Sequence, residues 1–337
     1  MKLRGAVVGC GFISEFHLRG WARLPEVEIC ALADPDRARA EARRDRFAPA
    51  ARIYDGLEPL LAAETLDFVD LLTPPPLHAE HCRRAAAAGL HLICQKPLCD
   101  RLEDAVSLVA DLASHPRLFV VHENHRYRPW FQQVLALAHE NFLGPWRHVE
   151  LLQHDPSEPP ERVNLEAERG VLLQYGVHLA DMMVALLGDP VRVHARLGRI
   201  NPRVRGESAA IAVFEYPETT VALDVSWKAG GVGQGHALFV GEAGEACYEG
   251  RMTRSAAARF RVCRDRQVVR DETRVPLDDY VESFFQFERD FVEAVLRGAP
   301  PPPSAAENLR SLRAIFAAYE SARTGTIVTL ADYGPHP

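Results

Sequence analysis

The sequence lacks several features that would place it in a specialised class of protein. Its 39 Lys and Arg residues are outnumbered by 46 Asp and Glu residues, its formal net charge is −7, and it contains no basic block. Nucleic-acid-binding proteins need a basic patch, so this class is disfavoured. No segment reaches the roughly 20 apolar residues that a membrane-spanning helix requires. We therefore expect neither a nucleic acid nor a membrane as partner.

Disulfide patterns and a secretion signal are also missing. The seven cysteines are an odd number spread over the whole chain, and no two of them form a Cys-x-x-Cys pair. Unpaired thiols are typical of the cytosol. Gly9 and Gly11 interrupt the first apolar run, which distinguishes it from the apolar segment of a signal peptide. These absences predict a cytoplasmic protein without a cleaved leader.

The composition is that of an ordinary globular protein. The chain has 337 residues, of which 47% are hydrophobic and 25% are charged. At roughly 150 residues per domain, this length predicts about two domains. The balance of apolar and charged residues excludes disordered, collagen-like and coiled-coil classes.

The first third of the chain alternates apolar strand patterns with helical patterns. The strands are predicted at 3–8, 27–33, 68–72, 90–94 and 118–122, and the helices at about 16–24, 37–47, 77–88 and 100–113. Such alternation favours a parallel sheet with helices on both faces. We predict an α/β fold whose first domain, residues 1–122, is a doubly wound parallel sheet of the Rossmann type.

The pattern changes after residue 122. A β-rich stretch between residues 191 and 270 predicts an antiparallel sheet. We expect a second, α+β domain over residues 123–337, whose last helices could pack back on the first domain. A strand is predicted at 146–154, further strands at 209–216, 220–227, 236–240 and 258–263, and helices at 129–141, 170–187, 281–296 and 305–324.

A glycine-containing turn joins the first predicted strand to the first helix. It has the pattern Gly9-x-Gly11-x-x-Ser14, with Phe12 and Ile13 inside the turn. Glycines permit a tight turn and let backbone N–H groups approach a pyrophosphate at the helix N-terminus. This position predicts a dinucleotide-binding site, and a purely structural glycine turn is the alternative.

Asp34 ends the second predicted strand, about 20 residues after the glycine turn. An acidic residue there accepts hydrogen bonds from the adenosine ribose, and its charge repels a 2′-phosphate. The sequence therefore favours NAD over NADP as cofactor, although Arg37 is close enough to weaken this preference. Helix capping by Asp34 is the structural alternative.

Two further loops follow strands at the carboxyl edge of the predicted sheet, where ligands bind in open α/β folds. Thr73 and Pro74 begin one loop, and His78 lies in the helix that follows. Gln95 and Lys96 begin the other loop. An ammonium group stabilises an alkoxide as hydride leaves, and a neutral lysine accepts the hydroxyl proton. Lys96 is therefore a candidate catalytic residue, with an exposed loop lysine as the alternative.

Taken in order, these motifs resemble the Gfo/Idh/MocA family of glucose-fructose oxidoreductases, inositol dehydrogenases and rhizopine catabolism proteins. The resemblance extends over nearly the whole chain. It rests on Gly9-Cys10-Gly11-Phe12-Ile13-Ser14, Ala33-Asp34-Pro35, Thr73-Pro74 with His78, Ala88-Gly89, Lys96-Pro97-Leu98, residues 170–188 and the two last helices.

The resemblance implies an NAD-binding domain followed by a domain with an open, mostly antiparallel sheet, through which a homodimer or homotetramer forms. It implies hydride transfer between nicotinamide and a secondary alcohol or ketone of a sugar, polyol or related compound. Lys96 and His178 would be catalytic, and Gln174 and Tyr175 would bind substrate. The cofactor-binding set would be Gly9, Gly11, Phe12, Ile13, Asp34, Arg37, Thr73, Pro74, His78, Gln95, Lys96 and Asn124.

The sequence departs from the family pattern at two positions. Gln95 stands where the family usually has Glu, and loss of a negative neighbour disfavours protonated Lys96. Gln174 stands where the family usually has Asp, four residues before His178. Helical spacing would place Gln174 and His178 on one face, but Gln174 exchanges no proton. His178 and Lys96 would then be the residues that exchange protons with the substrate.

Other polar residues have two possible interpretations. Arg126 and Asn124 lie at the predicted domain junction, where Asn124 could contact the cofactor and Arg126 the substrate. An interdomain salt bridge explains Arg126 almost as well. Asp181 could orient the imidazole of His178, and a solvated or helix-pairing role is the alternative. Loops at 156–168 and 228–235 are expected to set substrate specificity.

Two other functional classes remain to be weighed. His78-x-x-His81 and His122-x-x-His125 have helical ligand spacing, but neither comes with an HExxH motif or an obvious third ligand, so we expect no metal. The stronger alternative keeps NAD without net redox turnover. It is a glycosidase or eliminase that uses transient oxidation, or a non-catalytic dinucleotide-binding protein.

Overall fold

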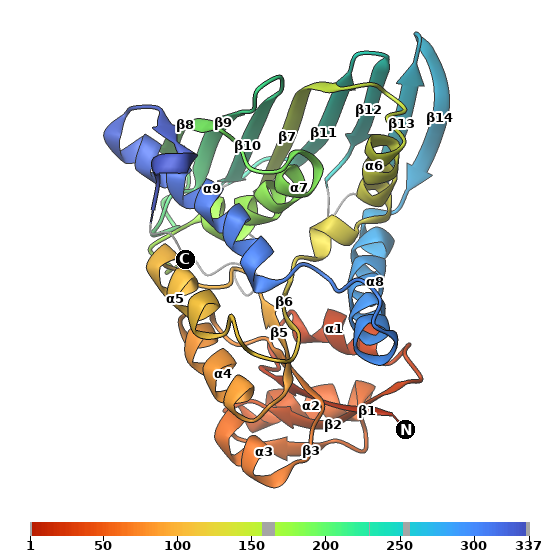
Figure 1. Cartoon of the computed structure of the whole chain (residues 1–337), viewed down its shortest axis with the longest axis vertical. Coiled ribbons are helices and arrows are strands. Elements are labelled where there is room, and N and C mark those ends of the chain that lie inside the picture. Colours follow the sequence, from red (N-terminus) through yellow and green to blue (C-terminus); the bar gives the residue numbers. More distant parts are fainter. Residues whose placement is uncertain (1, 157–165, 229, 252–256, 335–337) are drawn as a thin grey trace. The chain divides into compact units, whose positions relative to one another are not determined.

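The computed structural model describes residues 2–156, 166–228, 230–251 and 257–334. The chain divides into two units, each built on its own sheet (Figure 1). The first unit contains the chain up to Asn124 together with Val281–Leu309, and the second contains His125–Tyr280 and Arg310–Gly334.

The first unit has a sheet of six parallel strands in the order β3-β2-β1-β4-β5-β6. The order reverses at β1, which makes the gap between β1 and β4 the switch point of a Rossmann-type fold. Central strands such as β4 are buried along their whole length, as expected for a sheet covered on both faces. The predicted fold of the first part is confirmed. The strands are β1 (Leu3–Val8), β2 (Val27–Ala33), β3 (Arg52–Tyr54), β4 (Phe68–Leu71), β5 (His91–Gln95) and β6 (Phe119–His122).

Helices connect successive strands of this sheet (Figure 1). Pro75 stands at the first position of its helix, and Gly89 follows the C-terminus of the same helix with φ of 76°, a left-handed conformation that is common after helix ends. The short β3 and α3 were missed, because three and seven residues carry little periodicity. The helices are α1 (Ser14–Trp21), α2 (Arg37–Phe47), α3 (Leu57–Ala63), α4 (Pro75–Ala87) and α5 (Leu102–Asp111).

A late segment of the chain completes the core of the first unit. Helix α8 (Pro276–Arg297) begins in the second unit, and its residues from Val281 on belong to the first. A Cβ at Gly20 of α1 would lie 1.8 Å from Oε2 of Glu288, so only glycine leaves room for this carboxyl group. Aromatic pairs join α8 to α1 and β4, namely Phe16–Phe284, Trp21–Phe291 and Phe68–Phe291, with centroid distances of 5.5, 6.3 and 5.4 Å.

The second unit has a mixed sheet in the order β14-β13-β12-β11-β7-β10-β9-β8-β15. Its neighbouring strands pair antiparallel, except β7 and β10, which pair parallel. The predicted open, mostly antiparallel sheet is therefore confirmed. The strands are β7 (Trp146–Pro156), β8 (Arg192–Gly198), β9 (Ala209–Glu215), β10 (Thr220–Lys228), β11 (Gln234–Gly241), β12 (Gly244–Glu249), β13 (Ala258–Arg264), β14 (Gln267–Arg274) and β15 (Val328–Thr329).

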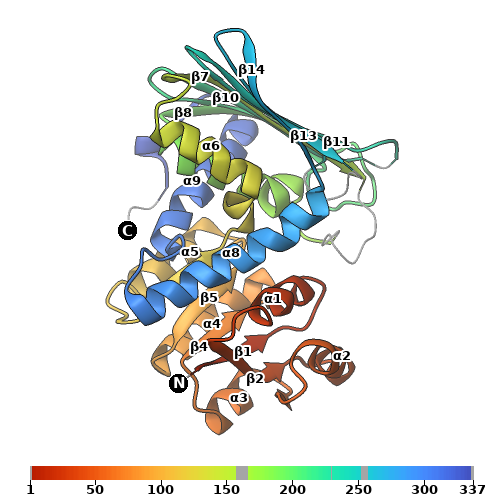
Figure 2. The same ribbon diagram turned by 90° about the vertical axis from the view of Figure 1, so that its right-hand side faces the viewer.

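Helices lie on one face of the second sheet (Figure 2). They are α6 (Pro129–His139), α7 (Val177–Leu187) and the part of α9 (Ala305–Thr324) that follows Arg310. No helix of the described residues covers the opposite face. Strand β9 reflects this asymmetry, because Phe214 is buried whereas Ile211 is 55% exposed.

The helix predicted over residues 170–187 is not a uniform α-helix. Its first part, Leu172–Gly176, is a π-helical turn, and α7 begins at Val177. A π-turn inserts an extra residue into the turn and is often found at functional sites. The prediction of one continuous α-helix is therefore wrong for this segment.

All seven cysteines lie in the described part of the chain and are free thiols. None of the helices in the described ranges has the length and apolar character needed to cross a membrane.

Candidate functional site

The glycine turn has the geometry of an anion-binding loop. Gly9 has φ of 100°, and a Cβ there would lie 2.6 Å from the carbonyl oxygen of Leu72, so the position requires glycine. The space beside Gly11 is open. Among the described residues no side chain caps the N-terminus of α1, and half-buried Phe12 and Ile13 precede it. This arrangement fits a pyrophosphate group.

Asp34 ties the glycine turn to the end of β2. Its Oδ2 accepts a hydrogen bond of 2.7 Å from the backbone N–H of Cys10, and its Oδ1 accepts one of 2.8 Å from Asp36. Asp36, and not Asp34, caps α2, so the helix-capping alternative is wrong. Arg37 is exposed and pairs with Glu41 at 3.0 Å. A carboxylate with free lone pairs at this place suits a ribose diol.

Arg43 supports the same turn and was not found from the sequence. Its guanidinium donates hydrogen bonds to Oγ of Ser14 at 3.0 Å and to the carbonyl oxygen of Gly11 at 3.2 Å. Arg43 lies in an Ala- and Arg-rich helix whose arginines look alike, so the sequence contains no signal that distinguishes it.

His78 holds two loops together at the carboxyl edge of the sheet. Its side chain is fully buried, with Nε2 2.6 Å from the carbonyl oxygen of Thr73 and Nδ1 3.0 Å from that of Pro97. Burial lowers the pKa of His78. Pro74 is exposed at the N-cap of α4. Nδ1 of His81 lies 3.1 Å from Oγ1 of Thr73, so the two histidines bond to the loops and not to a shared centre.

Lys96 follows β5 and is half-buried. Removal of water from its ammonium group lowers the pKa of Lys96 to about 8, and the charge of Glu123 opposes this change. Oε1 of Gln95 accepts a hydrogen bond of 2.8 Å from the backbone N–H of Lys96, and its amide nitrogen lies 2.9 Å from Nε2 of His17. Burial thus brings the pKa of Lys96 closer to neutral pH than that of an exposed lysine.

Glu123 and Asn124 follow β6, beside Lys96 in the sheet order. Glu123 is fully buried and accepts a hydrogen bond of 3.3 Å from Asn308. Asn124, predicted to contact the cofactor, donates a hydrogen bond of 3.0 Å to Ser283 of α8. Sequence reasoning missed Glu123, although its position directly after a buried strand was a usable signal.

Of the described residues, His17, His122 and Glu288 form the group of metal-type ligands whose atoms lie within 4.8 Å of one another. The rings of His17 and His122 pack at a centroid distance of 4.1 Å. Nδ1 of His17 lies 2.8 Å from Oδ2 of Asp70, and its Nε2 faces Gln95, so both nitrogens of His17 are used. We assign no metal site to this group.

In the second unit, an aromatic cluster surrounds His178. The ring of His125 stacks on His178 at a centroid distance of 4.0 Å and an angle of 26°. Oη of Tyr175 lies 3.5 Å from Nε2 of His125. Burial raises the pKa of Tyr175 well above its usual range. Two predicted residues, His178 and Tyr175, are therefore brought together, and His125 joins them.

Gln174 lies in the π-helical turn before α7. Its amide nitrogen donates a hydrogen bond of 3.0 Å to the carbonyl oxygen of Arg169, and the side chain is half-buried. The argument that Gln174 and His178 share an α-helical face assumed regular α-helical geometry, which the π-turn at Leu172–Gly176 replaces.

Arg126 forms a two-point ion pair with Asp181. Its Nε and Nη2 donate hydrogen bonds of 2.9 and 2.7 Å to the two carboxylate oxygens. Ser311 donates a further hydrogen bond of 3.2 Å to Asp181. The pair lies within the second unit, so it is not an interdomain salt bridge. Of the two interpretations of Asp181, the structure favours pairing with a neighbour.

Lys96 belongs to the first unit and His178 to the second. Their convergence beside a cofactor stays a prediction. The loops expected to set specificity include residues 157–165 and 229, which lie outside the described residues.

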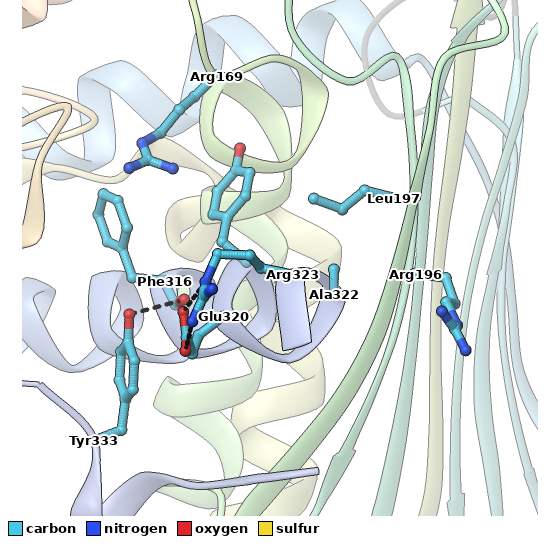
Figure 3. Close-up of a pocket in the computed structure, with 9 residues that line it drawn as sticks. Arg169, Arg196, Leu197, Phe316, Glu320, Ala322, Arg323 and Tyr333 are labelled. Carbon is cyan, nitrogen blue, oxygen red and sulfur yellow. Dashed lines mark hydrogen bonds and ion pairs between the residues drawn. The ribbon is translucent and has the colours of Figure 1, made fainter. Parts of the chain in front are cut away.

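A pocket of about 410 Å³ lies in the second unit (Figure 3). The arginine-rich lining includes Arg323, which forms an ion pair with Glu320. None of the predicted site residues lines this pocket. The lining residues are Arg169, Arg196, Leu197, Phe316, Tyr319, Glu320, Ala322, Arg323 and Tyr333.

Comparisons with known proteins cover both units. Residues 3–123 match the model of an oxidoreductase family with an NAD-binding Rossmann fold, and residues 131–247 match the C-terminal domain of the GFO/IDH/MocA family. A D-apiose dehydrogenase of Paraburkholderia graminis is 31% identical, over 98% of this chain and 90% of the relative.

Two further relatives are similar to this chain over nearly their whole length. An inositol 2-dehydrogenase of Rhizobium meliloti is 26% identical, over 98% of this chain and all of the relative. A similar fold is found in the crystal structure of an oxidoreductase from Agrobacterium radiobacter with NAD+, L-tartaric acid and magnesium. The sequence of that chain is 26% identical to this one. It covers 98% of this chain and 99% of its own, with a TM-score of 0.87.

Proposed function

The chain belongs to the Gfo/Idh/MocA family of oxidoreductases with an NAD-binding Rossmann fold, and we propose that it is a sugar or polyol dehydrogenase acting on a secondary alcohol, or the reverse reductase. The single observation that carries the proposal is Lys96. A half-buried lysine with a pKa of about 8 follows a strand at the carboxyl edge of the sheet. Such a group takes or gives a proton at the pH of the cell.

The residues of the first unit fit NAD. The open space beside Gly11 and the uncapped N-terminus of α1 suit the pyrophosphate, and Asp34 suits the ribose of NAD better than a 2′-phosphate. NAD, when bound, supplies the nicotinamide carbon that accepts or returns the hydride. Thr73, Pro74 and Gln95 belong to loops at the same edge of the sheet, and His78 fixes two of these loops.

The residues of this chain would exchange the proton and bind the substrate. Lys96 accepts the hydroxyl proton in the oxidising direction, and in the reducing direction its ammonium group donates it. His178 is the second proton-exchanging group, with its ring held by the stack with His125. Gln174 and Tyr175 bind substrate hydroxyls through an amide and a phenol. Arg126 does its part indirectly, because its ion pair with Asp181 holds α7, the helix that carries His178.

The substrate class is supported by the relatives. D-apiose and inositol, the substrates in their names, are small compounds rich in hydroxyl groups. The neutral amide of Gln174 and the imidazole of His178 suit hydroxyl groups better than a charged ligand. We therefore propose a sugar or sugar-like polyol as substrate, and not an acyl or phosphoryl compound.

Domain organisation, assembly and location are part of the proposal. Residues 1–122 would be the dinucleotide domain and residues 123–337 the substrate domain, with a late helix returning to the first. The uncovered face of the second sheet, with exposed Ile211 and Val213, supports a homodimer or homotetramer through this sheet. The free thiols support a cytoplasmic location.

The test is a panel of aldoses, branched sugars, inositols and sugar acids, mixed with purified protein and NAD. We expect at least one compound to give sustained accumulation of NADH, read by its absorbance. Product formed without any NADH would favour transient oxidation, with NAD retained. NAD binding with no change in any compound in either direction would contradict the dehydrogenase proposal.

A further inference from the structure

The strand register brings an acidic residue beside Lys96. Gln95, the last residue of β5, pairs in register with His122, the last residue of β6. Neighbouring strands lie about 4.8 Å apart. The next residues of the two strands, Lys96 and Glu123, therefore leave the sheet at adjacent positions of its carboxyl edge.

Glu123 is held in a place where a charge needs a partner. Its side chain is fully buried, and Asn308 at the start of α9 donates a hydrogen bond to its Oε1. An amide donor favours the carboxylate form, but a buried carboxylate normally also pairs with a cation. Lys96 is the cation whose titration Glu123 affects, because the carboxylate raises the pKa of the lysine against the effect of burial.

Residue 95 does not supply this negative charge. Gln95 is neutral, and its orientation is fixed by two hydrogen bonds. Its oxygen accepts from the backbone of Lys96, so its amide N–H faces Nε2 of His17. Nδ1 of His17 in turn donates to Asp70, which also accepts from Trp21. The amide at residue 95 lets neutral His17 make both bonds, whereas a carboxylate there has no hydrogen to donate and would require protonated His17.

We propose that Glu123 is the charge partner that positions the ammonium group of Lys96 and keeps it protonated, in place of an acid at residue 95. The inference rests on the proposed function, because Lys96 must exchange the substrate proton for this pairing to affect turnover. Glu123 is a positioning residue, since it acts through the lysine.

Burial shifts the pKa of several other titratable groups around the two strands toward the neutral form. Burial lowers the pKa of His78 of α4, raises that of Cys94 of β5, and raises that of Cys99 in the following loop to about 12. The thiol of Cys82 of α4 interacts with that of Cys94. Burial, followed by the charge of Asp70, raises the pKa of Glu288 of α8 well above its usual range.

The remaining groups of these elements have other partners. Asp70 of β4 is bonded to His17 and Trp21, and the ring of His122 packs between His17 and Phe287, with centroid distances of 4.1 Å to each. The carboxylate of Glu123 is therefore the acid we assign to Lys96.

The small number of lysines allows a direct test of this pairing by NMR. Lys2, Lys96 and Lys228 are the three lysines of the chain. Protein labelled with ¹³C at the lysine ε-carbon gives three NMR signals, and Lys96→Arg identifies the signal of residue 96. We expect this signal to titrate with a pKa of about 8 in the wild-type protein without cofactor.

Three variants then separate charge from packing. Glu123→Gln keeps the shape and the oxygen that Asn308 contacts, and we expect it to lower the pKa of Lys96 by roughly one unit or more. Adding Gln95→Glu to it returns an acid to the lysine and raises the pKa again. Glu288→Gln, a matched change of another buried glutamate, should leave the Lys96 titration unchanged. An unchanged titration in Glu123→Gln overturns the proposal.

If Glu123→Gln does not fold, Glu123→Asp gives the same test. Its charge lies one methylene farther from the lysine, so the pKa of Lys96 should fall by a smaller amount, and equality with wild type would contradict the pairing. None of these titrations needs substrate. A protein whose Lys96 responds as expected but that oxidises no alcohol would refute the proposed function and leave the pairing intact.

Turnover gives a second readout for the active enzyme. The pH at which kcat reaches half its maximum should move down with the pKa of Lys96 in Glu123→Gln, and return in the Gln95→Glu, Glu123→Gln double variant. A loss of packing alone would lower kcat at every pH without moving this midpoint.

Discussion

The two units hold their candidate site residues in different ways. In the first, Asp34 and His78 are held by backbone groups, namely the N–H of Cys10 and two carbonyl oxygens. In the second, Arg126 and Asp181 are held by each other's side chains. Backbone contacts depend on the fold, whereas side-chain contacts depend on the identity of both partners. Asp34 and His78 should therefore tolerate changes of neighbouring side chains better than the Arg126–Asp181 pair does.

The largest effect should come from the lysine of the first unit. Lys96→Ala removes the proton-exchanging group and leaves the glycine turn untouched. We expect turnover to fall at least a hundredfold, about 2.7 kcal/mol in activation free energy, while NAD affinity stays near wild type. Steady-state kinetics and an NAD titration measure both quantities. Unchanged turnover would remove Lys96 from the mechanism.

A smaller effect should follow from breaking the side-chain pair of the second unit. Arg126→Met leaves the buried carboxylate of Asp181 without its guanidinium, and we expect the free energy of unfolding to fall by about 2 kcal/mol in urea titrations. The double variant Arg126→Met, Asp181→Asn should recover part of this loss. A raised KM for the sugar with unchanged stability would instead mean that Arg126 contacts substrate directly.

The smallest effect should be the loss of cofactor preference. Asp34→Ala removes the carboxylate that we assign to the ribose. It should weaken NAD binding about tenfold, while NADP loses less because a repulsive charge has also gone. Binding titrations with both cofactors measure the ratio. The control is Asp36→Ala, which removes the cap of α2 and should leave the ratio unchanged. Equal losses for NAD and NADP would contradict the ribose assignment.

The sequence predicted most of the first unit because its signals are local. Gly9, the apolar strands and Gly89 are each fixed by the conformation of a few neighbouring residues. Strands β3 and β14 were not predicted individually, for two different reasons. The first has three residues, and the second is exposed on both faces and shows no alternation.

The site was harder to predict because its contacts join distant segments. The stack of His125 on His178, and the hydrogen bond from Asn308 to Glu123, link residues 53 and 185 positions apart in the chain. The π-turn at Leu172–Gly176 likewise could not be seen, because its residues match an amphipathic α-helix in composition. A hydrophobic pattern predicts which face of a helix or strand is apolar. It does not predict which polar side chains contact each other.

The contacts of α8 limit how this protein can be divided by engineering. A fragment that stops at the end of the matched Rossmann segment would leave the rings of Trp21 and Phe68 without Phe291, and would leave an unfilled hollow at Gly20. Transplanting the dinucleotide module into another enzyme therefore requires residues 281–309 as well. An internal deletion that joins the segment after β6 directly to residue 281 offers a route to a self-sufficient module.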